Sequence, residues 1–151
     1  MKKIFISSLI LFVAFATASA ADYNIKKYGA ISDTTKYSTK AIQKAIDACS
    51  KAGGGRVVVP AGNYKIGSIV LKSNVHLHLE MGATLYGSTR IEDYIPFATD
   101  YKSLRTQGTT VQLIYGDKVE NVVIDGYGTI DGRGRYFKTI RGKDEGITRP
   151  H

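Results

Sequence analysis

The stretch Asn74-Val75-His76-Leu77, followed through Gly82 by Thr84-Leu85-Tyr86-Gly87, decides the expected fold because a similar stretch returns later in the chain. In the second copy, Asn121-Val122-Val123-Ile124 leads through Gly128 to Thr129-Ile130-Asp131-Gly132. Each copy holds two short apolar strands joined by one tight turn, without a helical segment between them. An approximate repeat of this kind is typical of a β-solenoid, in which each coil buries apolar side chains against the next.

The chain after Gly55 consists largely of similar short runs that are rich in Val, Ile, Leu and Tyr and bounded by Gly, Asn, Asp or Pro. We predict strands at residues 56–59, 64–72, 75–79, 84–86, 111–115, 119–124 and 129–130. A β-sandwich is the alternative, but hairpin signals such as Asn-Gly are absent from the strand pairs. The segment 90–108 interrupts the pattern and is predicted to be a long loop that projects from the coil.

One helix is predicted before the strands. Apolar residues recur there at the three- and four-residue spacing that places them on one helical face, namely Ala41, Ile42, Ala45, Ile46, Ala48, Cys49 and Ala52. We predict a helix at about 39–52, with Ser38 as its N-cap and Gly53 closing it in a left-handed conformation. Cys49 is the only cysteine, so no intramolecular disulfide is possible. Its position on the apolar face predicts a buried side chain.

Residues 1–20 have the layout of a secretory signal peptide: Lys2-Lys3, an apolar run over 4–15, and Ala18-Ser19-Ala20. We therefore expect a mature chain of one domain, 21–151, exported to the periplasm or the extracellular space. The apolar run is shorter than a comfortable membrane span of roughly 20 residues, so no stable membrane insertion is expected after cleavage. Losing Lys2 and Lys3 lowers the formal charge from +8 to +6, which still favours an acidic partner. Nucleic acid is not expected, because no basic run is longer than a pair.

Few residues suggest chemistry. Asp125 and Asp131 are each followed by glycine, a pattern that favours turns in which the carboxylate bonds its own backbone over an acid and base pair. His76, His78 and Glu80 alternate with apolar residues and should share one strand face, where we expect a solvent-facing polar stripe and not a metal site.

Other motifs also favour structural roles. The glycines at 126, 128, 132 and 134 lack the spacing and the following helix of a phosphate-binding loop. Tyr94, Tyr101 and Tyr136 are the tyrosines most suited to stacking on sugar rings, because they lie in predicted loops. No Ser-His-Asp or Cys-His arrangement is indicated by the three histidines.

Several segments in order resemble the opening of family 28 of the glycoside hydrolases, the polygalacturonase-like enzymes of the pectate-lyase-type β-helix superfamily. They are 41–49, 53–62, 67–75, 82–85 and the turn 128–134. The resemblance implies a right-handed parallel β-helix with the helix at 39–52 capping its N-terminal end. It further implies inverting hydrolysis of an acidic plant polysaccharide, pectin or rhamnogalacturonan, by a protein that is monomeric when full length and needs no metal or other cofactor.

The same resemblance assigns no catalytic residue to this sequence. Relatives carry their acid and base in Asn-Thr-Asp, Asp-Asp, Gly-His-Gly and Arg-Ile-Lys motifs, and none of these occurs among the 151 residues. We therefore expect a truncated N-terminal part of the domain that is inactive alone, with its substrate-binding residues unknown. Two alternatives stay open: part of a calcium-dependent lyase with the same fold, and a non-catalytic glycan-binding β-solenoid.

Overall fold

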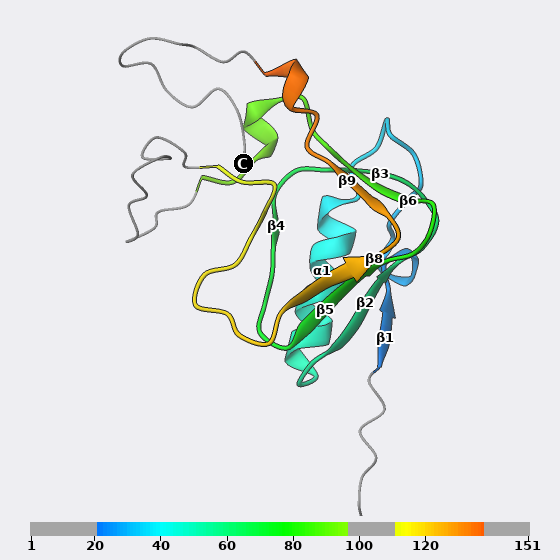
Figure 1. Cartoon of the computed structure of the whole chain (residues 1–151), viewed down its shortest axis with the longest axis vertical. Helices are drawn as coiled ribbons and strands as arrows, with labels where there is room; N and C mark the ends of the chain where they lie inside the picture. The colour runs from blue at the N-terminus through cyan, green and yellow to red at the C-terminus, as the bar shows by residue number, and fades with distance from the viewer. Residues whose placement is uncertain (1–20, 97–110, 138–151) are drawn as a thin grey trace, which may run out of the picture.

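A computed structural model describes residues 21–96 and 111–137, and in these residues the chain winds as a parallel β-helix (Figure 1). The strands are β1 (Asp22–Asn24), β2 (Gly55–Val59), β3 (Gly62–Ile66), β4 (Ile69–Val70), β5 (Val75–Leu79), β6 (Ala83–Gly87), β7 (Ile114–Tyr115), β8 (Val123–Gly126) and β9 (Thr129–Asp131). Short 3-10 helices are η1 (Ile25–Tyr28), η2 (Ile91–Asp93) and η3 (Gly134–Tyr136), and the α-helix is α1 (Thr39–Lys51).

The strands form three sheets, because each coil contributes one strand to each side. Their orders are β1-β2-β5-β8, β3-β6-β9 and β4-β7. Every pairing between named strands is parallel. This arrangement confirms the solenoid and excludes the β-sandwich, whose strands would pair largely antiparallel.

The two copies of the sequence repeat occupy equivalent places in successive coils. Strand β5 pairs with β8 so that Leu77 lies opposite Ile124, and β6 pairs with β9 so that Leu85 lies opposite Ile130. The two asparagines that begin the repeat also stack. Asn74 and Asn121 both have left-handed backbones, with φ of 63° and 55°. The Nδ2 group of Asn121 donates a hydrogen bond of 2.9 Å to Oδ1 of Asn74.

The core fills the inside of the coils. Alternate residues of each strand point inward, as the two-residue period of a strand requires. The inward side chains that are fully buried include Val57, Val59, Tyr64, Ile66, Ile69, Val75, Leu77 and Leu85. Helix α1 adds Ile42, Ala45, Ile46 and Cys49 to the same core. Cys49 is therefore buried as predicted, and this burial raises the pKa of its thiol.

Helix α1 begins and ends where the sequence indicated, but its N-cap works differently. Ser38 occupies the cap position without making a side-chain cap bond. Its hydroxyl instead bonds both backbone groups of Ile31, accepting from the N–H at 3.1 Å and donating to the carbonyl at 3.0 Å. At the other end Gly53 has φ of +96°, the left-handed conformation that was predicted.

Polar side chains of α1 satisfy backbone groups of the first coil. Gln43 does so twice, because its Oε1 accepts from the Val70 N–H and its Nε2 donates to the Val70 carbonyl, both at 2.9 Å. The hydroxyl of Thr39 accepts from the Gly67 N–H at 2.8 Å, and that of Ser50 donates to the Ser73 carbonyl at 3.1 Å. These bonds protect strand edges that would otherwise be open to pairing with another chain, so α1 caps the coil as the family resemblance implied.

Several strand boundaries were predicted wrongly. The segment 64–72 contains two strands on different sheets, because Gly67 and Ser68 form a buried corner between β3 and β4. The last predicted long strand, 119–124, begins only at Val123, and the strand at 111–115 is reduced to 114–115. Strand β1 was not anticipated. Part of the long loop predicted at 90–108 lies outside the described residues, although Pro96 and Val111 form an antiparallel bridge.

Among the described residues, no helix has both the length and the apolar character needed to cross a membrane.

Candidate functional site

The outer face of the sheet β1-β2-β5-β8 carries a cluster of ionisable side chains. On β5, the inward positions are taken by Val75, Leu77 and Leu79, so His76 and His78 point outward and remain partly exposed. The alternation therefore places both imidazoles on one face, as the sequence predicted. Glu80 follows the end of the strand and is exposed.

Asp125 joins the two histidines from the next coil. It lies on β8 directly opposite His78. Its Oδ1 atom lies 2.7 Å from Nε2 of His76 and 2.6 Å from Nδ1 of His78. The hydrogen bonds to His76 first, and then to His78, lower the pKa of Asp125. The prediction that Asp125 bonds its own backbone in a turn was therefore wrong, because the strand continues through it and turns its carboxylate to the histidines.

Asp131 behaves as predicted. Its Oδ1 accepts a hydrogen bond of 2.8 Å from the backbone N–H of Arg133, two residues further along the chain. This is the local turn that Asp followed by Gly favours.

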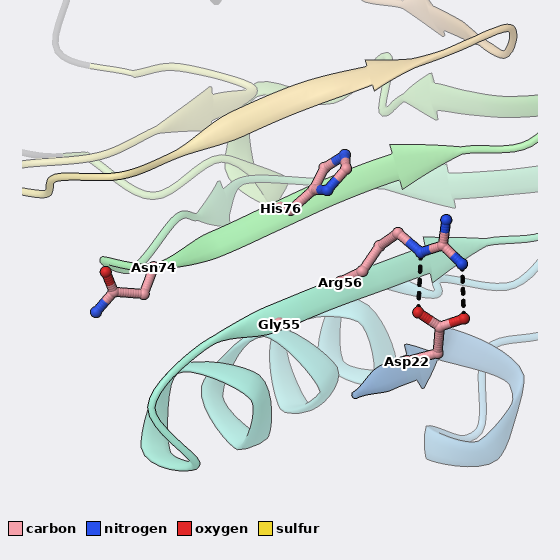
Figure 2. Close-up of a pocket in the computed structure, with 5 residues that line it drawn as sticks. All are labelled: Asp22, Gly55, Arg56, Asn74 and His76. Atoms are coloured by element: carbon pink, nitrogen blue, oxygen red, sulfur yellow. Dashed lines mark hydrogen bonds and ion pairs between the residues drawn. The ribbon is translucent and has the colours of Figure 1, made fainter. Parts of the chain in front are cut away.

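An ion pair borders the histidines on the side of the first coil. Arg56 on β2 donates from Nε and from an Nη atom to the two carboxylate oxygens of Asp22 on β1, at 2.9 and 2.7 Å. Figure 2 shows this pair beside His76, and the three residues line an open pocket with Gly55 and Asn74. The hydrogen bond from Arg56 lowers the pKa of Asp22. A two-point contact of this kind fixes the direction of the guanidinium group.

The structure separates the three tyrosines that were candidates for sugar stacking. Tyr94 is buried, donates a hydrogen bond of 2.6 Å to the Ser88 carbonyl, and has its pKa raised to about 12 by burial, so it is not a stacking platform. Tyr101 lies outside the described residues. Tyr136 is 50% exposed. The guanidinium groups of Arg133 and Arg135 lie 4.6 and 5.3 Å from the centre of its ring.

A third polar group fixes the start of the predicted loop. The hydroxyl groups of Tyr37 and Ser88 both donate to Oδ2 of Asp93. Burial acts to raise the pKa of Asp93, but these two hydrogen bonds and the nearby cations Arg90 and Lys65 lower it overall. The contacts join residues from before α1, after β6 and within η2, which indicates a structural role.

The glycines near Asp125 have a packing role. A Cβ atom on Gly126 would lie 2.0 Å from the Leu79 carbonyl oxygen, and one on Gly128 would lie 2.6 Å from the Leu79 Cβ. At Gly126 and Gly128 the backbone therefore lies too close to the preceding coil for a side chain.

The contact of Asp125 with the two histidines was not predicted from the sequence. The His-x-His spacing was visible in the sequence, but the third group comes from a strand one coil later. Only the register of β5 against β8 shows that it meets them. The repeat that begins at Asn74 and Asn121 was the available signal, since aligning its two copies brings Asp125 opposite His78.

Comparison with known proteins gives a consistent result. A family model described as rhamnogalacturonase A/epimerase, pectate lyase-like, matches residues 23–140. An exo-poly-α-D-galacturonosidase of Dickeya chrysanthemi is 43% identical over 137 residues, which are 85% of this chain and 22% of that protein.

Two solved structures also match. The family 28 exopolygalacturonase of Yersinia enterocolitica has 37% identity and a TM-score of 0.67, covering 78% of this chain and 22% of that one. A hyperthermoactive exopolygalacturonase of Thermotoga maritima has 33% identity and a TM-score of 0.65, covering 76% and 25%. The chain thus spans 22% to 25% of the length of these three relatives.

Proposed function

Because this chain belongs to the rhamnogalacturonase A/epimerase, pectate lyase-like family, we propose that it forms the capped coils of a secreted hydrolase that degrades acidic pectin. The observation that carries the proposal is the joint likeness, in sequence and in fold, to enzymes named for exo-cleavage of polygalacturonate. The chain shares their right-handed parallel β-helix. The substrate class is polygalacturonate or rhamnogalacturonan.

The group of Tyr136 and Arg135, which are exposed, and Arg133, which is partly exposed, supports an acidic sugar as ligand. Stacking on the phenol ring holds both guanidinium groups near one another at the surface. A guanidinium group has five N–H donors in a planar fork that matches a carboxylate. Two such forks on one ring suit the carboxylate of a galacturonate residue, and the formal charge of +6 that remains after the loss of Lys2 and Lys3 adds long-range attraction for a polyanion.

Hydrolysis itself is assigned to none of the 151 residues. An inverting glycosidase needs two carboxyl groups roughly 6.5–9.5 Å apart, one to protonate the leaving oxygen and one to activate water. The motifs that carry these groups in the family are absent from this sequence. The 151-residue protein is therefore expected to bind the polysaccharide without cleaving it.

Binding of oligogalacturonates tests the proposal, with a neutral galacto-oligosaccharide of equal length as the control ligand. We expect calorimetry to detect the acidic ligand alone, with affinity that falls as salt is added. The double variant Arg133→Ala/Arg135→Ala should lower the affinity at least about tenfold, since each lost charge-assisted contact contributes about 1.5–3 kcal/mol.

Lys26→Ala/Lys27→Ala is the matched control, because it removes two exposed positive charges from η1. If both double variants lost the same affinity for oligogalacturonate, binding would depend only on the overall positive charge and not on Arg133 and Arg135. Failure of the folded protein to bind oligogalacturonate would contradict the proposal. A reducing-sugar assay on the same samples should remain at background, and unsaturated products would favour a lyase.

Export is a separate part of the proposal. It rests on residues 1–20, which lie outside the described residues, and on the fact that β1 begins at Asp22, immediately after the expected cleavage site. Mass spectrometry of the protein recovered outside the cytoplasm should show a chain that begins near Ala21. A product that retains Met1 would contradict the proposed cleavage.

A further inference from the structure

Three side chains from two coils bring potential metal ligands to one place on the outer face of the β-helix. His76 and His78 come from β5 and Asp125 from β8. Their ligand atoms all lie within 4.8 Å of one another. We propose that these residues form a binding site for a divalent transition-metal ion of the zinc class. The site is separate from the proposed hydrolysis of pectin and does not depend on it.

The distances suit such an ion. In a tetrahedral zinc site, two ligand atoms that are each about 2.1 Å from the metal lie about 3.4 Å from one another. In the structure, the Asp125 oxygen lies 2.7 and 2.6 Å from the two imidazole nitrogens. An ion therefore needs the carboxylate to withdraw by less than about 1 Å from each ring. The two imidazole nitrogens, which lie within 4.8 Å of one another, must also take a spacing of about 3.4 Å. Because Asp125 is exposed and both histidines are partly exposed, rotations of these side chains bring the three ligand atoms to those distances.

The chemistry of the ligands selects the class of metal. Two imidazole nitrogens and one carboxylate oxygen suit Zn²⁺ and its neighbours Co²⁺, Ni²⁺ and Cu²⁺. Mg²⁺ and Ca²⁺ prefer shells made of oxygen and are poorly served by two nitrogen ligands. The three protein ligands leave at least one coordination position for water, and the partial exposure of all three side chains gives an ion direct access from solvent.

The surrounding charges permit a cation. Arg56 lies directly opposite His76 in the register of β2 and β5. Its positive charge would oppose a metal, but Asp22 neutralises it through the two hydrogen bonds described above. The Asp125 carboxylate already points at the two imidazole rings, with which it forms hydrogen bonds. A bound ion would replace these hydrogen bonds and use the same carboxylate oxygen as a ligand.

The position of the site predicts its effect. Strands β5 and β8 belong to successive coils, which backbone pairing joins along the strands and the Asn74–Asn121 hydrogen bond joins where the strands begin. A bound ion would link the two coils through side chains. Because it binds the folded arrangement and not the unfolded chain, it should raise the thermal transition of the protein.

Titration of Zn²⁺ into the untagged 151-residue protein, cleared of metal by a chelator, tests the inference. We expect one Zn²⁺ per chain, measured by competition with a chromogenic chelator at neutral pH. His76→Ala, His78→Ala and Asp125→Asn should each lower the affinity at least about 100-fold, because even partners outside the ligand shell contribute 10–100-fold. Added Mg²⁺ or Ca²⁺ in excess should not displace the ion.

Matched controls separate the site from non-specific binding. His151→Ala removes the third histidine, and Asp131→Asn removes a carboxylate whose role is the turn before Arg133. Both should bind as the original protein does. Far-UV circular dichroism identifies any variant that fails to fold. In that case, histidine ring resonances of the original protein decide the matter, because two of the three rings should shift on addition of Zn²⁺.

The inference is overturned if binding is not stoichiometric, if the His76, His78 and Asp125 variants bind as tightly as the controls, or if no histidine ring responds. None of these results would affect the binding of oligogalacturonate, which is measured without metal.

Discussion

Two stacked asparagines show what a single residue contributes to the register of the coils. Asn74 and Asn121 occupy the same place in successive coils, with left-handed backbones and a side-chain hydrogen bond between them. Asparagine adopts this conformation more readily than other residues with a Cβ atom, because its side chain bonds locally. The position therefore selects Asn for its backbone and for the contact between coils.

We expect Asn74→Ala to lower the free energy of unfolding by about 2 kcal/mol and Asn74→Gly by about 1 kcal/mol. Both substitutions lose the hydrogen bond, worth about 1 kcal/mol, but only alanine adds the cost of a left-handed backbone, about 1–2 kcal/mol. Urea denaturation of the two variants measures the difference. If Asn74→Ala were as stable as Asn74→Gly, the backbone conformation would not be the cause.

The lowered pKa of Asp93 predicts that the folded protein loses stability in acid. Its folded-state pKa is lowered below the ordinary value of 3.8, so the carboxylate stabilises the fold fully above that pH and loses its contribution as the pH falls further. Asp93→Asn should therefore destabilise the protein at neutral pH and have a smaller effect below pH 3.8. Thermal unfolding at a series of pH values gives both curves, and curves that stay parallel would exclude Asp93 as the source.

At the scale of elements, Gln43 makes two of the hydrogen bonds by which α1 caps the first coil. Its side-chain amide forms hydrogen bonds with both backbone groups of Val70, as a neighbouring strand would do at the edge of β4. Gln43→Ala keeps a residue that favours helix but leaves the partly buried Val70 N–H and carbonyl without these partners. We expect a loss of about 1–3 kcal/mol of unfolding free energy.

Lys44→Ala is the control for this prediction, because Lys44 is the next residue of α1 and is exposed. Its substitution should change stability by less than about 0.5 kcal/mol. Similar losses in both variants, measured by the same denaturation, would show that the helix is sensitive in general and that the Val70 contact is not special.

The elements were predictable where local pattern decides them. Helix α1 and strand β5 match their predictions almost residue for residue, because apolar spacing and flanking glycine or asparagine define both. The corner at Gly67 and Ser68 was missed because apolar residues continue on both sides while the chain changes sheets. Asp125 was misread for a related reason: its neighbours in sequence suggest a turn, whereas its partners His76 and His78 belong to the preceding coil.

At the scale of the whole molecule, the two ends of the described β-helix differ. Helix α1 covers the first coil. At the other end, the last inward-facing residues of the described strands are Ile124 and Ile130, which are 46% and 41% exposed. Their register partners Leu77 and Leu85 are fully buried. Val123 and Tyr127 add exposed apolar surface near the same end. Exposed apolar side chains at one end of a solenoid favour association.

We therefore expect the 151-residue protein to associate with itself in a concentration-dependent way through this surface. Ile124→Thr/Ile130→Thr should weaken the association, because each substitution removes apolar area whose burial contributes about 25 cal/mol per Å². Met81→Thr is the control, since Met81 is 75% exposed in the turn between β5 and β6. Sedimentation velocity over a range of concentrations distinguishes the variants. A single monomeric species at every concentration would mean that Ile124 and Ile130 are covered within the chain itself, and that the coils are closed at both ends.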